Sequence, residues 1–300
     1  MRNGLRFVHN RIRDTFTAEE LVKATPDNRM IGYPYTKRLN SNNMVDQGAA
    51  LIMCSVERAE QLGVPREQWV FLHAGTDADD HWFFSTRDEL HRSPAMRTAG
   101  RTVLDLAGVG HDDLTHIDLY SCFPSAVLIS AREIGLGSGV GTDPVLTVTG
   151  GMSFAGGPWN NYVMHSIATT VERLRADGDD AGRGLVSGNG GYLTEHSFGV
   201  YATAPPPSGT YAWASTQDEV DALPQREVDT EPWGEATIEA YTVMHDRDGN
   251  PERGFVAVRT PEDRRGWVAP TDDETLAGLL ELDEPVGLTI KVRSATELDL

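Results

Sequence analysis

Residues 146–174 read LTVTGGMSFAGGPWNNYVMHSIATTVERL, and the fold of the chain is inferred mainly from this stretch. It begins with a β-branched run, continues through a glycine-rich turn and ends in a helix pattern that carries no charge before Glu172. Glycines allow backbone conformations that other residues avoid, and a helix without charges is usually buried. The stretch therefore predicts a strand, a tight turn and a buried helix that form the floor of an active site.

Strand and helix patterns alternate on both sides of this stretch. Ser93 and Pro94 predict a helix start, because serine caps free backbone N–H groups and proline fits the first helical position, and Gly108 predicts the helix end. Strands are expected at 49–53, 69–74, 117–120, 145–148, 184–187 and 198–202. Such alternation predicts an α/β fold, a layered sheet covered by helices.

The segment TAPPPSG at 203–209 predicts a linker, because three consecutive prolines favour an extended chain and cannot enter a central strand. After it come two alternating runs around a DGNPERG turn and one further strand pattern, which is typical of a small all-β barrel. We expect four regions: a loop or linker region at 1–44, an α/β domain at 45–203, a linker at 204–230 and a small β domain at 231–300.

The composition argues against several classes of function. The formal net charge of −19 disfavours nucleic-acid binding, which depends on Lys and Arg that neutralise phosphates. An anionic cofactor would need a local region of positive charge, which Arg92, Arg97 and Arg101 could supply. The two cysteines, Cys54 and Cys122, are too few for a disulfide framework and lack metal-ligand spacing, so no metal site is expected.

The chain also lacks the signals of a membrane or secreted protein. No run approaches the roughly 18 apolar residues that a membrane span requires, and the N-terminal residues lack the apolar core of a secretory signal. Two cysteines without a framework fit a reducing compartment. These features predict a cytoplasmic protein.

Small residues follow three of the expected strands, at Tyr120–Pro124, Gly150–Asn161 and Ser187–Gly191. Open α/β sheets bind ligands beyond the carboxyl ends of their strands. Each segment alone is most simply a tight turn, because glycine is the usual residue there. Three such segments in one chain predict a binding site.

Four motifs in order resemble those of the thiolase superfamily. They are VDQGAALIMCS at 45–55, YSCFPSA at 120–126, TGGMSFAGGPWNN at 149–161 and SGNGGY at 187–192. The chain is most similar to the C-terminal half of thiolase-like proteins related to sterol-carrier-protein thiolases, often named acetyl-CoA acetyltransferase, which carry an additional C-terminal OB-like domain. The resemblance implies the C-terminal half of a thiolase fold, a layered sheet with a buried helix, followed by the β barrel.

The resemblance also implies a set of site residues, with departures from the family pattern. Thiolases use a nucleophilic cysteine, a histidine and a second cysteine or histidine. Here Gly157 takes the place of the histidine, Ser187 that of the late cysteine, and Tyr120 that of a histidine found in the sterol-carrier type. The candidates for catalysis are Cys122, Ser121, Ser187 and His196, and those for substrate binding are Tyr120, Gly156, Gly157, Asn189 and Gly190.

Two of these candidates have a simpler interpretation. Cys122 is either a reactive thiol or a small core residue, and His196 is either a replacement base or a hydrogen-bonded structural histidine.

The expected ligand is coenzyme A or acyl-CoA, with no tightly bound cofactor. The expected function is acyl-CoA binding or acyl transfer in lipid or sterol metabolism, and the alternative is a non-catalytic scaffold with a thiolase fold.

The resemblance predicts a partner as well. The nucleophilic cysteine of a thiolase lies in an N-terminal half that has no counterpart in this sequence. We therefore expect either a separate thiolase N-terminal half or a homo-oligomer, and we expect part of the uncharged stretch 159–171 to be exposed when the chain is alone.

Overall fold

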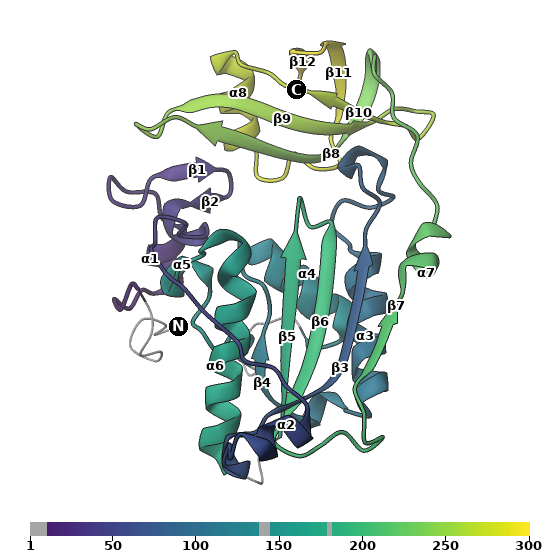
Figure 1. Cartoon of the computed structure of the whole chain (residues 1–300). Coiled ribbons are helices and arrows are strands. Elements are labelled where there is room, and N and C mark those ends of the chain that lie inside the picture. The colour runs from purple at the N-terminus through teal and green to yellow at the C-terminus, as the bar shows by residue number, and fades with distance from the viewer. Residues whose placement is uncertain (1–10, 138–144, 179–181) are drawn as a thin grey trace. The chain divides into compact units, whose positions relative to one another are not determined.

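The computed structural model describes residues 11–137, 145–178 and 182–300 (Figure 1). Contacts divide the chain into two compact units. The first unit contains residues 11–15, Ser41–Asp80 and His91–Leu223, and the second contains Phe16–Asn40, His81–Leu90 and Pro224–Leu300. Each unit therefore collects segments that lie far apart in the sequence.

The two units do not coincide with the four consecutive regions expected from the sequence. Residues 16–40, expected as loop, belong to the second unit together with the C-terminal part of the chain. The region 204–230, expected as a linker, contributes β7 (Ala212–Ser215) and α7 (Gln217–Asp221) to the first unit. Consecutive boundaries cannot describe this arrangement, because strand pairing joins segments from distant parts of the chain.

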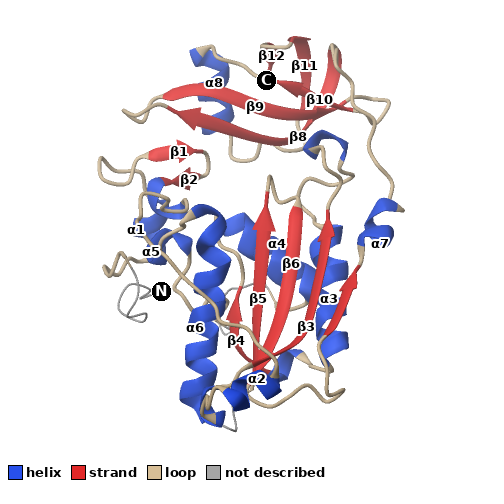
Figure 2. Cartoon of the chain, in the orientation of Figure 1, coloured by secondary structure: helices blue, strands red, loops and turns tan. Residues whose placement is uncertain are grey.

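The first unit is built on a mixed five-stranded sheet with the order β4-β5-β6-β3-β7 (Figure 2). Its other strands are β3 (Phe71–Asp79), β4 (Leu114–Asp118), β5 (Arg183–Gly190) and β6 (Glu195–Ala202). β4 is parallel to β5 and β7 is parallel to β3, whereas β6 is antiparallel to both of its neighbours. The expected layered α/β sheet is confirmed.

Helices cover both faces of this sheet, with α3 and α4 on one face and α6 on the other (Figure 2). Besides α7, the described helices of the first unit are α2 (Val56–Gln61), α3 (Pro94–Ala107), α4 (Pro124–Ile134), α5 (Met152–Ala155) and α6 (Tyr162–Asp177), with 3-10 turns η2 (Arg66–Gln68), η4 (His111–Asp113) and η5 (Trp159–Asn161). As expected, Ser93 caps α3, because its Oγ accepts from Met96 N over 3.1 Å.

Two of the expected strands are not formed. Residues 49–53 have no regular secondary structure, and the side chains of Ile52 and Met53 are 96% and 77% exposed. Residues 145–148 are joined to the end of β4 by one backbone hydrogen bond, from Leu119 N to Leu146 O (3.0 Å). An apolar run becomes a strand only where a neighbouring strand pairs with it, and the described residues offer no such neighbour to 49–53.

The second unit is an antiparallel sheet of seven strands with two helices and two 3-10 turns. Its strands are β1 (Met30–Gly32), β2 (Tyr35–Thr36), β8 (Gly234–His245), β9 (Pro251–Arg259), β10 (Arg265–Val268), β11 (Thr289–Ser294) and β12 (Glu297–Asp299). The other elements are α1 (Ala18–Val22), α8 (Asp273–Glu281), η1 (Lys37–Leu39) and η3 (Phe84–Thr86).

The closed OB-like barrel expected at 231–300 is not formed by the described strands. β8 pairs with β9 along one edge and with β11 and β1 along the other. β10 pairs with β9, and on its other side Arg265 bridges to Val228. β10 and β12 are not paired with each other, although Ala269 N donates to Ala295 O over 2.8 Å near their ends. The sheet therefore stays open.

Candidate functional site

The ends of β4 and β5 meet at one edge of the first unit's sheet. Tyr120 N donates to Ser187 Oγ over 2.9 Å, which links the residues after β4 to β5. Because β4 and β5 are parallel neighbours, their carboxyl ends lie at the same edge, where open α/β sheets bind ligands. Two of the three predicted turns are therefore in contact.

The buried carboxylate of Asp118, at the end of β4, holds the glycine-rich turn in place. Asp118 Oδ2 accepts from Val148 N (2.9 Å), Thr149 N (3.2 Å) and Thr147 Oγ1 (2.9 Å), and Oδ1 accepts from the Tyr162 hydroxyl (3.0 Å). Burial and the neighbouring carboxylate raise the pKa of Tyr162 well above its usual value, so the hydroxyl stays protonated and donates. This network ties strand, turn and α6 together.

Ser121 joins the third turn to the same edge. Its Oγ accepts from Met152 N, the first amide of α5, over 3.0 Å. The preceding residues, Gly150 and Gly151, have φ angles of 100° and 86°, which residues with a side chain rarely adopt. The structure thus brings together all three turns that the sequence predicted.

Cys122 lies where the three turns meet. Its sulfur is 3.9 Å from Asn189 Nδ2, and Asn189 Oδ1 is buried without a hydrogen-bond partner among the described residues. Burial raises the pKa of the Cys122 thiol, so the neutral thiol predominates at neutral pH. The site therefore presents a thiol and an amide oxygen that is free to accept a hydrogen bond.

Residues after position 40 cover the glycine-rich turn. Ser41 N donates to Cys122 O over 3.0 Å, and Gly157 N donates to Asn42 O over 2.8 Å. A Cβ placed on Gly157 would lie 2.0 Å from Ser41 Oγ, and Gly156 has a φ of 104°. A histidine at position 157, as in the thiolase pattern, would clash with Ser41 in this arrangement.

His196 is the cross-strand partner of Asn189 in the β5–β6 pair, but the described contacts of its side chain go to residues other than Cys122. Its Nε2 lies 3.3 Å from Asp80 Oδ2 and 3.4 Å from Ser93 Oγ, beside the start of α3, and the side chain is fully buried. The described contacts include no hydrogen bond from His196 to Cys122 or Ser187. In this structure Nε2 of His196 contacts Asp80 and Ser93, and its Nδ1 is buried without a hydrogen-bond partner among the described residues.

Gly190, also predicted for substrate binding, lies in the β5–β6 hairpin. Its carbonyl oxygen accepts from Thr194 N over 3.0 Å.

Asp118 and Ser41 are central to the site but were not predicted from the sequence. An acidic residue inside the apolar strand HIDL was the available signal for Asp118, since a buried charge requires partners.

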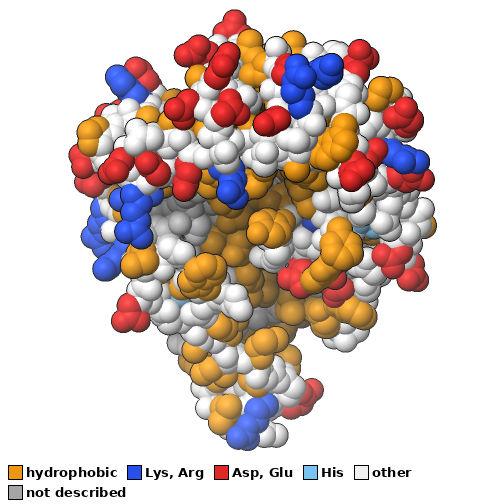
Figure 3. All heavy atoms as spheres, turned by 90° about the horizontal axis from the view of Figure 1, so that it is seen from above, with side chains coloured by type: hydrophobic (Ala, Val, Ile, Leu, Met, Phe, Trp, Pro, Cys, Tyr) orange, Lys and Arg blue, Asp and Glu red, His pale blue; other side chains and the backbone are white. Residues whose placement is uncertain are grey.

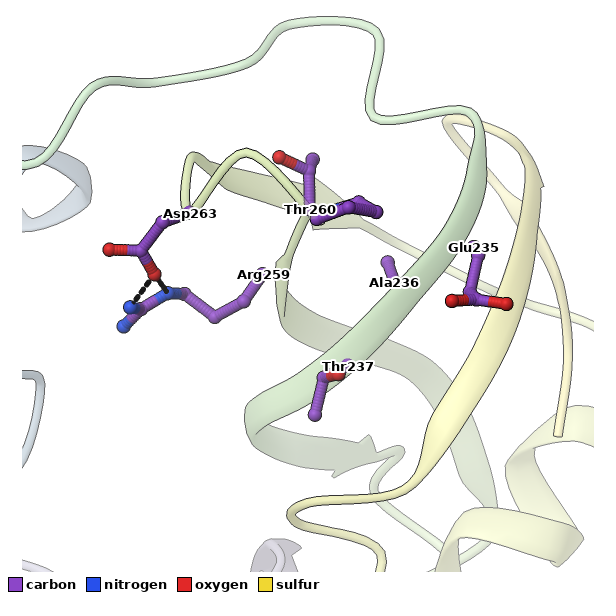
Figure 4. Close-up of a pocket in the computed structure, with 7 residues that line it drawn as sticks. Glu235, Ala236, Thr237, Arg259, Thr260 and Asp263 are labelled. Atoms are coloured by element: carbon purple, nitrogen blue, oxygen red, sulfur yellow. Dashed lines mark hydrogen bonds and ion pairs between the residues drawn. The ribbon is translucent and has the colours of Figure 1, made fainter.

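The second unit carries a shallow pocket of about 370 Å³ (Figure 4). Its only cation, Arg259, is already paired, because Nε donates to Asp263 Oδ1 (2.9 Å) and Nη1 to Glu239 Oε1 (3.2 Å). The pocket contains none of the predicted site residues. It is lined by Glu235, Ala236, Thr237, Arg259, Thr260, Pro261 and Asp263.

The described residues contain no group of three or more His, Cys, Asp and Glu side chains placed to hold a metal ion. No helix in the described ranges combines the length and apolar character needed to cross a membrane. On the face seen in Figure 3, acidic side chains are more frequent than Lys and Arg, in keeping with the net charge of −19.

Comparison with solved structures identifies the fold. A monomeric SCP2-thiolase-like protein type 1 from Mycobacterium smegmatis superimposes with a TM-score of 0.85 and 35% sequence identity, covering 97% of this chain and 63% of that one. The chain has a thiolase-like fold. The resemblance predicted from the four motifs is thereby confirmed.

Two sequence comparisons agree with the thiolase-like assignment. Residues 215–297 match the family of the additional C-terminal domain of thiolase-like protein type 1. A 3-ketoacyl-CoA thiolase from Escherichia fergusonii is 31% identical over 160 residues, which cover 49% of this chain and 34% of the relative. The thiolase-like chain therefore spans about a third of this curated relative.

Proposed function

We propose that this thiolase-like chain binds acyl-CoA and handles acyl groups in lipid or sterol metabolism, in the cytoplasm, through the turns that meet around Cys122. Support comes from the relative named 3-ketoacyl-CoA thiolase, whose name indicates acyl-CoA chemistry for that protein. The ligand is coenzyme A or its acyl thioester, with no tightly bound cofactor.

The observation that carries this proposal is the convergence of three turns on one thiol. In chain order, Tyr120 and Ser121 belong to the first turn: Tyr120 N donates to Ser187 Oγ of the third turn, and Ser121 Oγ accepts from Met152 N of the second. Asn189 of the third turn lies beside the sulfur of Cys122. Small residues and glycines leave room for amide-like groups of a ligand to approach the backbone closely. The unpaired Asn189 Oδ1 offers an acceptor for an N–H or thiol group of the ligand.

The geometry favours binding over Claisen condensation. Gly157 and Ser187 replace the thiolase histidine and late cysteine, and Cys122 has no imidazole partner among the described residues. The amides of Gly150 and Gly151 donate to threonine hydroxyls of their own turn, so they are not available to stabilise an oxyanion. Acyl transfer by this chain alone therefore lacks both the base and these two donors.

Titration calorimetry of the full chain with acetyl-CoA tests the proposal. Loss of one hydrogen bond through Asn189→Ala should weaken binding by roughly 3- to 10-fold. Cys122→Ala should also weaken binding, whereas Cys54→Ala is the matched control because that thiol is exposed and outside the site. Absence of binding to the wild-type chain, or equal weakening by both cysteine variants, would remove the proposal.

A second candidate function, a scaffold that assembles with another chain, is favoured by exposed apolar side chains of the first unit. Met44, Ile52, Met53 and Trp159 are between 70% and 96% exposed. Exposed apolar surface of this kind often marks an interaction site. The occupant would be a thiolase N-terminal half or a second copy of the chain, whereas the Mycobacterium smegmatis protein is described as monomeric.

Light scattering of the purified chain, alone and with a separately expressed thiolase N-terminal half, tests the scaffold function. The paired variant Ile52→Ser and Met53→Ser should lower the assembled mass. Leu106→Ser, which changes an exposed residue of α3, is the control. A monomeric mass under every condition would speak against this function.

A further inference from the structure

Three arginines surround one buried carboxylate in the first unit. Glu133, in the last turn of α4, is 1% exposed and accepts from Arg92 Nε (2.5 Å), Arg97 Nε (2.8 Å) and Arg132 Nη2 (3.4 Å). A fourth, Arg101, donates from Nε to the carbonyl oxygen of Glu133 over 3.1 Å. We call these four side chains the arginine cluster. They come from α3, from α4 and from the residue just before the α3 cap.

The arginine cluster carries more positive charge than Glu133 requires. One guanidinium can hold a carboxylate through two parallel hydrogen bonds. Although burial alone would raise the pKa of Glu133, the bonds and charges of Arg92 and Arg97 bring it below its usual value. The only other acidic residue on α3 or α4 is Asp105, one turn beyond Arg101. Among the described residues, Arg97, Arg101 and Arg132 thus bring three positive charges near the single buried carboxylate of Glu133.

Much of the arginine cluster is open to solvent and has unused donors. The side chains of Arg92, Arg97 and Arg132 are 34%, 37% and 45% exposed. The terminal nitrogens of Arg97 and Arg101 have no partner among the described residues. These two residues are four positions apart on α3, which places them side by side on one face of the helix.

We propose that the arginine cluster binds a phosphate-bearing ligand, specifically a diphosphate or polyphosphate group. A phosphate group accepts several hydrogen bonds from guanidinium forks, and two linked phosphates can engage neighbouring arginines at once. Glu133 holds the Nε atoms and leaves terminal N–H groups of Arg97 and Arg101 for the ligand. The buried carboxylate is thus the support of the site, and the exposed guanidinium ends are its binding surface.

The charge of the whole chain strengthens the assignment. A protein with a net charge of −19 repels anions over most of its surface, so a concentration of arginines is a local exception. Arg92, Arg97 and Arg101 are the same residues that the sequence marked for such an exception. The inference does not depend on the proposed acyl-CoA function, because the probe used below carries no thioester.

The test is titration of the full chain with inorganic pyrophosphate in magnesium-free buffer. Calorimetry measures the binding, and thermal unfolding measures the stability of each variant. The paired variant Arg97→Gln and Arg101→Gln should weaken pyrophosphate binding by about tenfold or more, since hydrogen bonds between charged groups are lost. The paired variant Arg58→Gln and Arg175→Gln removes the same charge elsewhere in the first unit and should leave binding within about twofold.

The outcomes separate the explanations. Selective loss in the Arg97 and Arg101 variant, with its unfolding temperature unchanged in the absence of ligand, supports a phosphate site. Equal loss in both paired variants means that only the overall charge matters, which overturns the proposal. No binding of pyrophosphate to the wild-type chain also overturns it, as does selective binding of a polyglutamate peptide in its place, which would indicate an acidic protein partner.

Discussion

Glu133 in the first unit and Glu239 in the second are both held by arginines, but the two sets of arginines differ in how completely they are used. Arg265 is fully buried, and Nε and Nη2 donate to the two oxygens of Glu239 at 2.6 and 2.7 Å. Its remaining donors reach the carbonyl oxygens of Ser85, Arg87 and Asp88. Arg97 at Glu133 instead uses only Nε and is 37% exposed.

This difference separates a structural ion pair from a surface that can take a ligand. Every N–H of Arg265 has a protein acceptor, so the residue joins the segment His81–Leu90 to the C-terminal sheet within the second unit. The arginine cluster has donors left over and solvent access. Similar residue types thus serve stability in one unit and, by our proposal, recognition in the other.

The largest effect is expected from Arg265→Ala. It leaves Glu239 partly unpaired and removes three bonds to backbone carbonyls, so the free energy of unfolding of the second unit should fall by about 3–5 kcal/mol. Chemical denaturation measures the loss. Arg264→Ala is the matched control, because Arg264 is 49% exposed and pairs with the exposed Glu227, and a loss of only about 0–1 kcal/mol is expected. Equal losses would contradict the comparison.

A smaller loss is expected from Glu133→Gln. The substitution keeps the shape but removes the charge that holds three arginines together, at a cost of about 2 kcal/mol. Arg92 and Arg97 can turn toward water, whereas the buried Arg265 cannot, so Glu239→Gln should cost more. Denaturation of both variants under one condition measures the order. A larger loss from Glu133→Gln would show that the cluster is not open to solvent.

The two carboxylates should also shape the dependence of stability on pH. Burial alone raises the pKa of Glu239, but the bonds and charges of Arg265 and Arg259 bring it below 4.5, and Glu133 is shifted in the same direction. A lowered pKa contributes stability that is present above pH 4.5 and is lost as the pH falls toward the folded-state value. Glu133→Gln and Glu239→Gln should each flatten the fall in unfolding free energy below pH 4.5. Curves parallel to wild type would refute this linkage.

The smallest effect on stability is expected from Arg132→Gln. Arg132 is 45% exposed and its 3.4 Å contact adds to shorter bonds from Arg92 and Arg97, so unfolding free energy should change by at most about 1 kcal/mol. Pyrophosphate binding should nonetheless weaken, because one of the four guanidinium groups is lost. A marked loss of stability without any change in pyrophosphate binding would show that Arg132 stabilises the fold and does not bind the ligand.

The sequence predicted much of the fold because local patterns are enough to show strands and helix ends. The cap at Ser93, the helix end at Gly108 and the turn before Pro251 were all visible as short-range signals. The open sheet of the second unit was not predicted from the sequence. It depends on the pairing of β8 with β1, which lies about 200 residues earlier in the chain. Pairings of this kind have no local pattern.

The candidate site was predicted in part for the same reason. Motif order placed Tyr120, Ser121, Cys122 and Ser187 at strand ends, and these residues do meet. His196 was considered as a base because of its residue type, yet its side chain contacts Asp80 and Ser93 instead. Side-chain partners across a sheet depend on register and packing, which a single sequence does not reveal.

By itself, the sequence determined the alternation of strands and helices, the positions of the glycine-rich turns and the thiolase-like order of motifs, because these depend on neighbours along the chain. The tertiary structure alone decided that Asp118 supports the turn, that Ser41 occupies the space beside Gly157 and that four arginines gather at Glu133. Such contacts form between segments distant in sequence, and they are selected by burial, which favours carboxylates and guanidinium groups only where each finds a partner.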